Sequence, residues 1–139
     1  MNVPIRMRVH GVSMCPRLQP NDIVYVQKAG EYYLGDILVY RYDTDMFLIH
    51  RFLSKHHKTL CCKGDNSFRI ERITNNDIIG KVVMIRRGTQ LLHMEKVSDN
   101  FLQESLRIGQ IFEENAHNIS NVMSTAEYVE FSTRYLRNE

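Results

Sequence analysis

The hydrophobic positions of the chain change their period near residue 97. Before that point, apolar residues alternate with polar ones or form short β-branched and aromatic runs, a pattern typical of strands. Turns rich in glycine, aspartate and asparagine separate the runs. The expected strands cover residues 5–9, 23–26, 37–42, 46–53, 59–63 and 78–85, with one turn expected at 43–45. Short strands at this spacing predict a mainly β fold, a small antiparallel β-barrel or sandwich.

The last part of the chain has a helical period instead. Apolar residues recur there at steps of three, four and seven, at Phe101, Ile108, Phe112, Ile119, Val122, Ala126 and Val129. Ser98 and Asp99 suit a helix start. We expect one long or two shorter amphipathic helices. A stripe at this spacing usually packs on the rest of the protein, and we favour that interpretation. The alternative is an arm that docks a partner or forms a homo-oligomer.

Charge divides the chain at the same place. Residues 1–96 hold 15 Lys and Arg against 9 Asp and Glu, whereas residues 97–139 hold 3 against 7. We therefore expect a β domain over 1–96 and a helical extension over 97–139. The formal net charge of the 139 residues is +2, which is too small to indicate a nucleic-acid partner.

Composition narrows the class of protein. Hydrophobic residues make up 43% and charged residues 24%, the balance of a folded globular chain. No window approaches the roughly 18 uncharged apolar residues of a membrane-spanning helix, and residues 1–8 alternate, unlike a signal peptide. Cys15, Cys61 and Cys62 form neither a disulfide framework nor a zinc pattern. We expect reduced thiols in a cytoplasmic protein without a transmembrane segment.

The segment 11–16, Gly-Val-Ser-Met-Cys-Pro, holds a candidate nucleophile. Glycine and proline can fix a serine in a turn whose backbone amides face one spot, as an oxyanion hole requires. Ser13 is that serine, although a turn serine alone is usually only a turn residue. Cys15, two residues later, is the alternative nucleophile or a small packing residue.

A serine nucleophile needs a proton acceptor, and His50 is the candidate base. Alternation in the run 47–52 puts His50 on the face of Leu48 and Phe52, an unusual place for a polar ring without a partner. Arg51 falls on the other face, where we expect it to be solvated. The alternative for His50 is a core histidine satisfied by a backbone carbonyl.

A carboxylate that accepts from the far imidazole nitrogen would fix its tautomer. Asp65, in a Gly-Asp-Asn turn, and Glu71, six residues later, are both candidates. For Asp65 the alternative is an ordinary turn residue.

The order of these segments resembles the signal peptidase I and LexA-like serine peptidase superfamily. The run 9–24 is similar to its Ser-Met-x-Pro nucleophile motif, and 35–40 to its second Gly-Asp strand. Residues 49–52, Ile-His-Arg-Phe, look like the segment that carries the general base, which is lysine in LexA-like and bacterial signal peptidases. Histidine followed by arginine is the pattern of the archaeal and endoplasmic-reticulum signal peptidases. Residues 63–66 resemble the Lys-Gly-Asp-Asn segment, and 79–82 the closing strand.

By this resemblance Ser13 is the nucleophile, His50 the base and Asp65 the turn aspartate, while Glu71 stands roughly where the family has a catalytic aspartate. The implied activity is a serine endopeptidase that cleaves a precursor or leader peptide without metal or cofactor. The family's membrane anchor is not recognised before Ser13, and Gly11 replaces the serine that many signal peptidases have two residues before the nucleophile. A peptide-binding module without catalysis on the same scaffold is the alternative.

Overall fold

The computed structural model describes residues 3–43 and 45–137. In this part of the chain eight strands form one antiparallel sheet, in the order β1-β2-β7-β3-β4-β5-β6, with β8 paired to β7. The strands are β1 (Ile5–Arg8), β2 (Ile23–Gln27), β3 (Ile37–Tyr42), β4 (Met46–His56), β5 (Thr59–Lys63), β6 (Glu71–Ile73), β7 (Ile78–Arg87) and β8 (Gln90–Leu92). A short 3₁₀ turn, η1 (Asn75–Asp77), leads into β7.

The sheet confirms the expected mainly β fold. All six expected strands form, and β4 runs three residues further than its hydrophobic run predicted. Two three-residue strands, β6 and β8, were not expected, because so short a segment carries too few positions to show a period. The turn expected at 43–45 includes Thr44, which lies outside the described residues.

Strand alternation builds the interior of the curled sheet. Val24 and Val26 of β2 point inward and are at most 1% exposed, while their neighbours are partly accessible. They pack with β3 and β7 in one apolar cluster. A second cluster forms between β3, β4 and β5 around Tyr40 and Phe52. Strand β3 contributes to both clusters, so its alternation is lost and Ile37–Tyr40 is buried throughout.

The C-terminal segment is helical, but it is divided more finely than the period predicted. It contains α1 (Asp99–Glu114), α2 (Ile119–Met123), α3 (Ala126–Phe131) and a π-helical turn η2 (Ser132–Leu136). Ser98 caps α1 by accepting from the Phe101 N–H. Helix α1 ends where Ala116 and His117 adopt φ of +51° and +60°. Asn118 and Thr125 then cap the next two helices, which explains the short segments.

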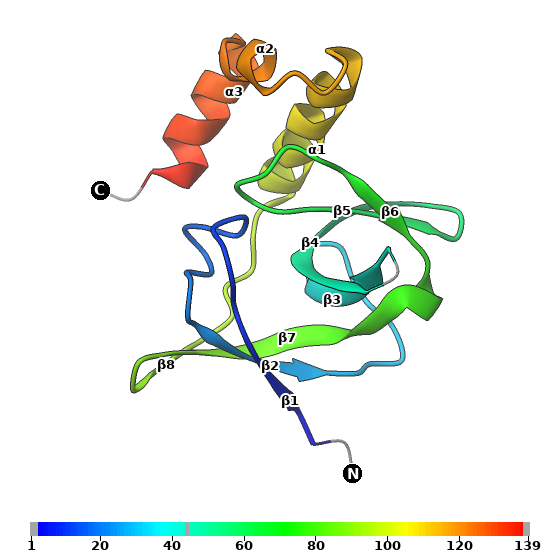
Figure 1. Cartoon of the computed structure of the whole chain (residues 1–139), viewed down its shortest axis with the longest axis vertical. Helices are drawn as coiled ribbons and strands as arrows, with labels where there is room; N and C mark the ends of the chain where they lie inside the picture. Colours follow the sequence, from blue (N-terminus) through cyan, green and yellow to red (C-terminus); the bar gives the residue numbers. More distant parts are fainter. Residues whose placement is uncertain (1–2, 44, 138–139) are drawn as a thin grey trace.

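The helices lie together at one end of the molecule, where they pack against the sheet (Figure 1). Phe101, Phe112 and Phe131 share an apolar cluster with Leu53 of β4 and with Phe68. The expected packing of an amphipathic helix on the β fold is therefore present. The arm-like role in partner docking or homo-oligomer formation, and the domain boundary at 96/97, stay predictions. None of the described helices is long and apolar enough to span a bilayer.

Candidate active site

Ser13 lies in the turn that connects β1 to β2. Gly11 opens this turn with φ of +78°, a left-handed conformation that glycine adopts without steric cost. The Cys15 N–H donates to the Val12 carbonyl oxygen at 3.0 Å, and Met14, 2% exposed, anchors the turn in the core. These contacts fix the backbone on both sides of Ser13.

His50 reaches Ser13 from the centre of the sheet. It lies on β4 opposite Leu38 of β3 and is 6% exposed. Its Nε2 atom is 3.0 Å from Ser13 Oγ, although 37 residues separate the two along the chain. This distance is within hydrogen-bond range, so the two side chains are placed for direct proton transfer.

Glu71, the first residue of β6, completes the contact on the other side of the imidazole. Its Oε1 atom lies 2.7 Å from His50 Nδ1, and the side chain is 1% exposed. Burial acts to raise the pKa of Glu71, but hydrogen bonds from His50, Tyr40 and Arg69, together with the His50 charge, outweigh it and hold the pKa below 4.5. An ionised carboxylate only accepts, so Nδ1 carries the proton and the Nε2 lone pair faces Ser13.

Asp65 does not contact His50. Its carboxylate pairs with the guanidinium of Arg51, at 2.6 Å from Nη2 and 3.2 Å from Nε. The expectation that Arg51 is solvated is wrong, because its side chain is 1% exposed. Residues 50–53 of β4 are all buried, so both faces of the strand are covered there, and the guanidinium is satisfied by Asp65 and by the Gly35 carbonyl oxygen at 3.0 Å. The structure thus places Glu71, and not Asp65, next to the imidazole.

Tyr40 is a member of the site that the sequence analysis missed. Its hydroxyl donates to Glu71 Oε1 at 2.6 Å and lies 3.4 Å from His50 Nδ1. Burial, and then the neighbouring Cys62 and Glu71, raise the pKa of Tyr40 above its ordinary value, so it remains a donor. A tyrosine inside an apolar strand carries no local signal of this contact. Its partner Glu71 belongs to β6, which lies three strands away from β3 in the sheet, and only folding brings the two side chains together.

The loop after β5 holds the Ser13 turn in place beside His50. The Asn66 N–H donates to the Ser13 carbonyl oxygen at 2.8 Å, and its side-chain amide donates to the Val12 carbonyl oxygen at 3.1 Å. A Cβ at Gly64 would lie 2.6 Å from the Ser13 carbonyl oxygen and 3.0 Å from His50 Nε2. Only glycine permits this approach without displacing one of them.

One of three comparisons with known proteins gives a match. A family model described as Peptidase S24-like matches residues 5–83. The chain belongs to the Peptidase S24-like family. The matched segment of this serine-peptidase-like protein contains Ser13, His50, Asp65 and Glu71 and ends before the helices. No curated protein and no solved structure matches the chain.

A groove passes over the Ser13–His50 pair of this S24-like protein. It has a volume of about 430 Å³ and is lined by residues 7–10 on one side and by 47–49 of β4 on the other. The β1 edge that faces away from β2, and the β4 edge before Arg51, carry no strand partner in the described part of the chain. Both edges therefore offer backbone groups to an extended peptide.

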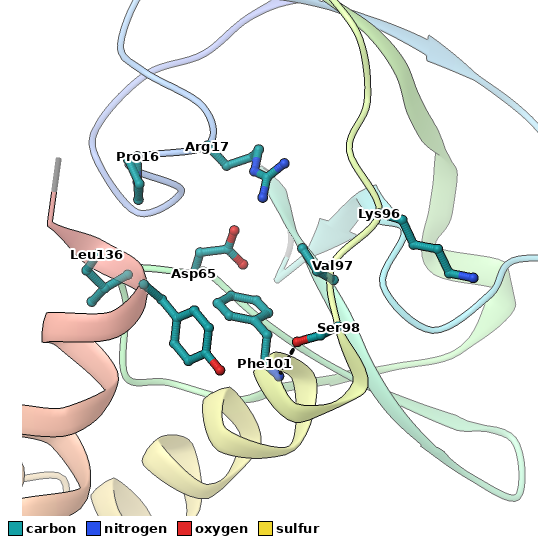
Figure 2. Close-up of a pocket in the computed structure, with 9 residues that line it drawn as sticks. Pro16, Arg17, Asp65, Lys96, Val97, Ser98, Phe101 and Leu136 are labelled. Carbon is teal, nitrogen blue, oxygen red and sulfur yellow. Dashed lines mark hydrogen bonds between the residues drawn. The ribbon is translucent and has the colours of Figure 1, made fainter. Parts of the chain in front are cut away.

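A separate cavity of about 230 Å³ lies on the Asp65 side of the Ser13 turn (Figure 2). Pro16 and Arg17 of the turn line it together with Phe101 of α1 and Leu136 of η2. Neither Ser13 nor His50 lines it, so we assign it no part in the chemistry. It shows that the end of the helical segment of this S24-like protein reaches the Ser13 turn. Among the described residues, no group of three or more His, Cys, Asp or Glu could hold a metal ion.

Proposed function

We propose that this S24-like protein is an endopeptidase that cleaves peptides through a Ser13 acyl-enzyme, with His50 as general base and Glu71 as the residue that orients it. The observation that carries the proposal is the continuous contact from Ser13 Oγ to His50 Nε2, at 3.0 Å, and from His50 Nδ1 to Glu71 Oε1, at 2.7 Å. A nucleophile, a base and a carboxylate in this order are what serine acyl transfer requires.

The mechanism follows from the proton positions. Ser13 Oγ attacks the scissile carbonyl carbon while its proton passes to His50 Nε2, and Glu71 stabilises the imidazolium through Nδ1–H. His50 then gives the proton to the leaving amine as the C–N bond breaks, which leaves an ester on Ser13. A water molecule, deprotonated by His50, attacks this ester; as the ester C–O bond breaks, His50 returns the proton to Ser13 Oγ and the acyl product leaves as a carboxylic acid. No step needs a metal or cofactor.

The turn itself would stabilise the charge that develops on the carbonyl oxygen. Gly11 has no side chain to contribute a hydroxyl, so backbone amides near Ser13 take this role in the proposal. The Asn66 contacts that hold the Ser13 and Val12 carbonyl oxygens keep the turn in one conformation. A preorganised turn has no reorganisation cost during the reaction.

The substrate we propose is an extended segment of a precursor or leader peptide. It would lie in the groove between β1 and residues 47–49 and add a strand to one of the two free edges. The Ser-His pattern, shared with the archaeal and endoplasmic-reticulum signal peptidases, suggests small side chains beside the cut. The three cysteines are free thiols, which is compatible with a cytoplasmic location.

The test compares hydrolysis of short peptides that carry alanine-like residues at the cut by the native protein and by Ser13→Ala. We expect the serine variant to lose cleavage, since removal of the nucleophile leaves no acyl-enzyme route. Cys15→Ser is the matched control, because it changes the other nucleophile of the same turn, and it should retain activity. Equal rates for native protein and Ser13→Ala would contradict the proposal.

A serine-directed acylating probe separates catalysis from binding alone. Labelling at Ser13 that disappears in His50→Ala supports an activated nucleophile. A protein that binds peptides but neither cuts them nor reacts with the probe would be the binding module instead.

A further inference from the structure

A second groove begins on the other side of the catalytic histidine. It has a volume of about 500 Å³, and His50, Ser67 and Glu71 form its end nearest the site. Its far wall comes from the helical segment, from Phe112 of α1 and from Ile119 at the start of α2. Both grooves are lined by His50, which therefore borders each of them.

The two grooves differ in their relation to the nucleophile. The groove beside β1 is lined by both Ser13 and His50, whereas the groove beside the helices is lined by His50 and not by Ser13. During acyl transfer the acyl half of the peptide becomes attached to Ser13, while the amine half receives its proton from His50. The groove beside the helices, which meets His50 and Glu71 but not Ser13, is the one that we relate to the leaving half.

The walls of this second groove are largely apolar. Phe68, Phe112 and Ile119 line it, and Ile119 is 49% exposed. The Arg69 guanidinium at the rim already donates to Glu71 at 3.1 Å and lies over the Tyr42 ring. His117 also lines the groove, with its ring 4.9 Å from that of Phe112. Beside these polar groups, the groove offers apolar contact to a ligand.

The helical wall is held rigidly relative to His50. Phe68, four residues after Gly64, packs its ring against Phe112 and Tyr128, with centroid distances of 5.9 and 5.4 Å. Arg72 of β6 makes a bidentate ion pair with Glu113 of α1, at 2.8 and 3.0 Å. A wall fixed in this way can select a side chain by shape.

We propose that the helical segment forms the leaving-side half of the substrate cleft, and that it selects peptides with a bulky apolar side chain in the first two or three residues after the cut. The occupant is the amine half of the substrate, and its apolar side chain covers Ile119 between Phe68 and Phe112. This inference rests on the proposed peptidase function, and it gives the C-terminal helices a part in specificity.

The experiment uses a peptide library that is randomised at the three positions after a constant acyl-side segment. Products are sequenced by mass spectrometry for the native full chain, for Ile119→Ala and for Val129→Ala. Val129 is the matched control, because it is 50% exposed on α3 and does not line the groove. Both substitutions remove methyl groups from exposed helical positions, so both variants should fold.

We expect the native protein to favour leucine or phenylalanine over glycine at one of these positions, and Ile119→Ala to lose about threefold to tenfold of that preference. Val129→Ala should keep it. The same preference in the native protein and in Ile119→Ala, or no apolar preference at all, would overturn the inference while leaving the peptidase function intact. Absence of any Ser13-dependent cleavage would instead refute the peptidase function, and the inference with it.

Discussion

His50 Nδ1 and Glu71 Oε1 lie 2.7 Å apart, and both side chains are almost inaccessible to solvent. The contact links β4 to the three-residue strand β6, and β5 lies between these two strands in the sheet. In a buried site a carboxylate that accepts from Nδ1 fixes both the tautomer and the direction of the imidazole. Glu71 is thus the carboxylate that contacts the imidazole.

Replacing Glu71 by glutamine should reduce kcat by about 10²–10⁴-fold, because the amide neither stabilises the imidazolium nor enforces the tautomer. Asp65→Asn is the matched control, since it neutralises the other buried carboxylate of the site region. It should keep most of the activity and lower the free energy of unfolding by about 3–5 kcal/mol, because Arg51 loses its ion pair. Steady-state kinetics and urea unfolding measure the two effects. A large loss of kcat in Asp65→Asn, with activity retained in Glu71→Gln, would show instead that Asp65 orients His50.

Tyr40→Phe should lower kcat about tenfold, because Glu71 loses a donor to its charged carboxylate. The hydrogen bond from Tyr40 lowers the pKa of Glu71, so its removal should raise that pKa. Ionised Glu71 stabilises the fold at pH values above 4.5, its ordinary pKa. This contribution is lost as the pH falls through the lower pKa that Glu71 has in the folded protein. The variant should therefore lose activity and unfold at a higher pH than the native protein during acid titration.

Tyr42→Phe is the control for this positioning role, because it removes a hydroxyl from the same strand and keeps the ring beside Arg69. Kinetics across acid pH and circular dichroism during acid titration measure the comparison. If Tyr40→Phe lowered stability but left the acid limb of both curves in place, Tyr40 would have only a packing role.

Gly64→Ala should reduce kcat about 10²-fold, because a displacement of about 1 Å at the nucleophile or base is enough for such a loss. The new Cβ would lie 2.6 Å from the Ser13 carbonyl oxygen and 3.0 Å from His50 Nε2. Gly30→Ala is the control, because a Cβ added at Gly30 would meet no heavy atom within 4 Å. Peptide hydrolysis by the two variants provides the comparison. An active Gly64→Ala would mean that the loop moves freely away from Ser13.

Lys63 should make stability depend on alkaline pH. Its side chain is fully buried, with Nζ donating to the carbonyl oxygens of Gly64 and Ser67, and burial lowers its pKa from 10.5 to about 8. Between these values the unfolded chain holds a proton that the folded chain has lost, so stability rises with pH. The free energy of unfolding of the native protein, relative to Lys63→Met, should increase by about 3 kcal/mol from pH 8 to 10.5.

Taking the difference in the free energy of unfolding between the native protein and Lys63→Met cancels the contribution of cysteines and tyrosines. Their titration lowers stability as pH rises, in the direction opposite to the effect of Lys63. Burial raises the pKa of Cys62, for example, so its ionisation in the unfolded chain reduces stability at high pH. Urea unfolding at several alkaline pH values gives the comparison. A constant difference would show that Lys63 keeps its charge in the folded protein.

Local periodicity was sufficient to predict most of the sheet. Strands β3 and β5 have the bounds that alternation and turn residues indicated, and α1 begins at the predicted cap. Such features depend on neighbours within a few residues. The short strand β6 does not, because three residues become a strand only through pairing with β5. The helical breaks after α1 likewise depend on caps too weak to predict alone.

Ser13 and His50 could be named as candidates from the sequence, although a turn serine is usually only a turn residue. The order of the segments that carry them, which resembles that of a known family, favoured the catalytic interpretation. The choice between Asp65 and Glu71, the burial of Arg51 and the role of Tyr40 were decided by tertiary structure. Each depends on which strands lie next to each other in the sheet, and hence on distances between residues 14 to 31 positions apart. A buried charge takes whichever partner the packed sheet places beside it, and no local pattern encodes that partner.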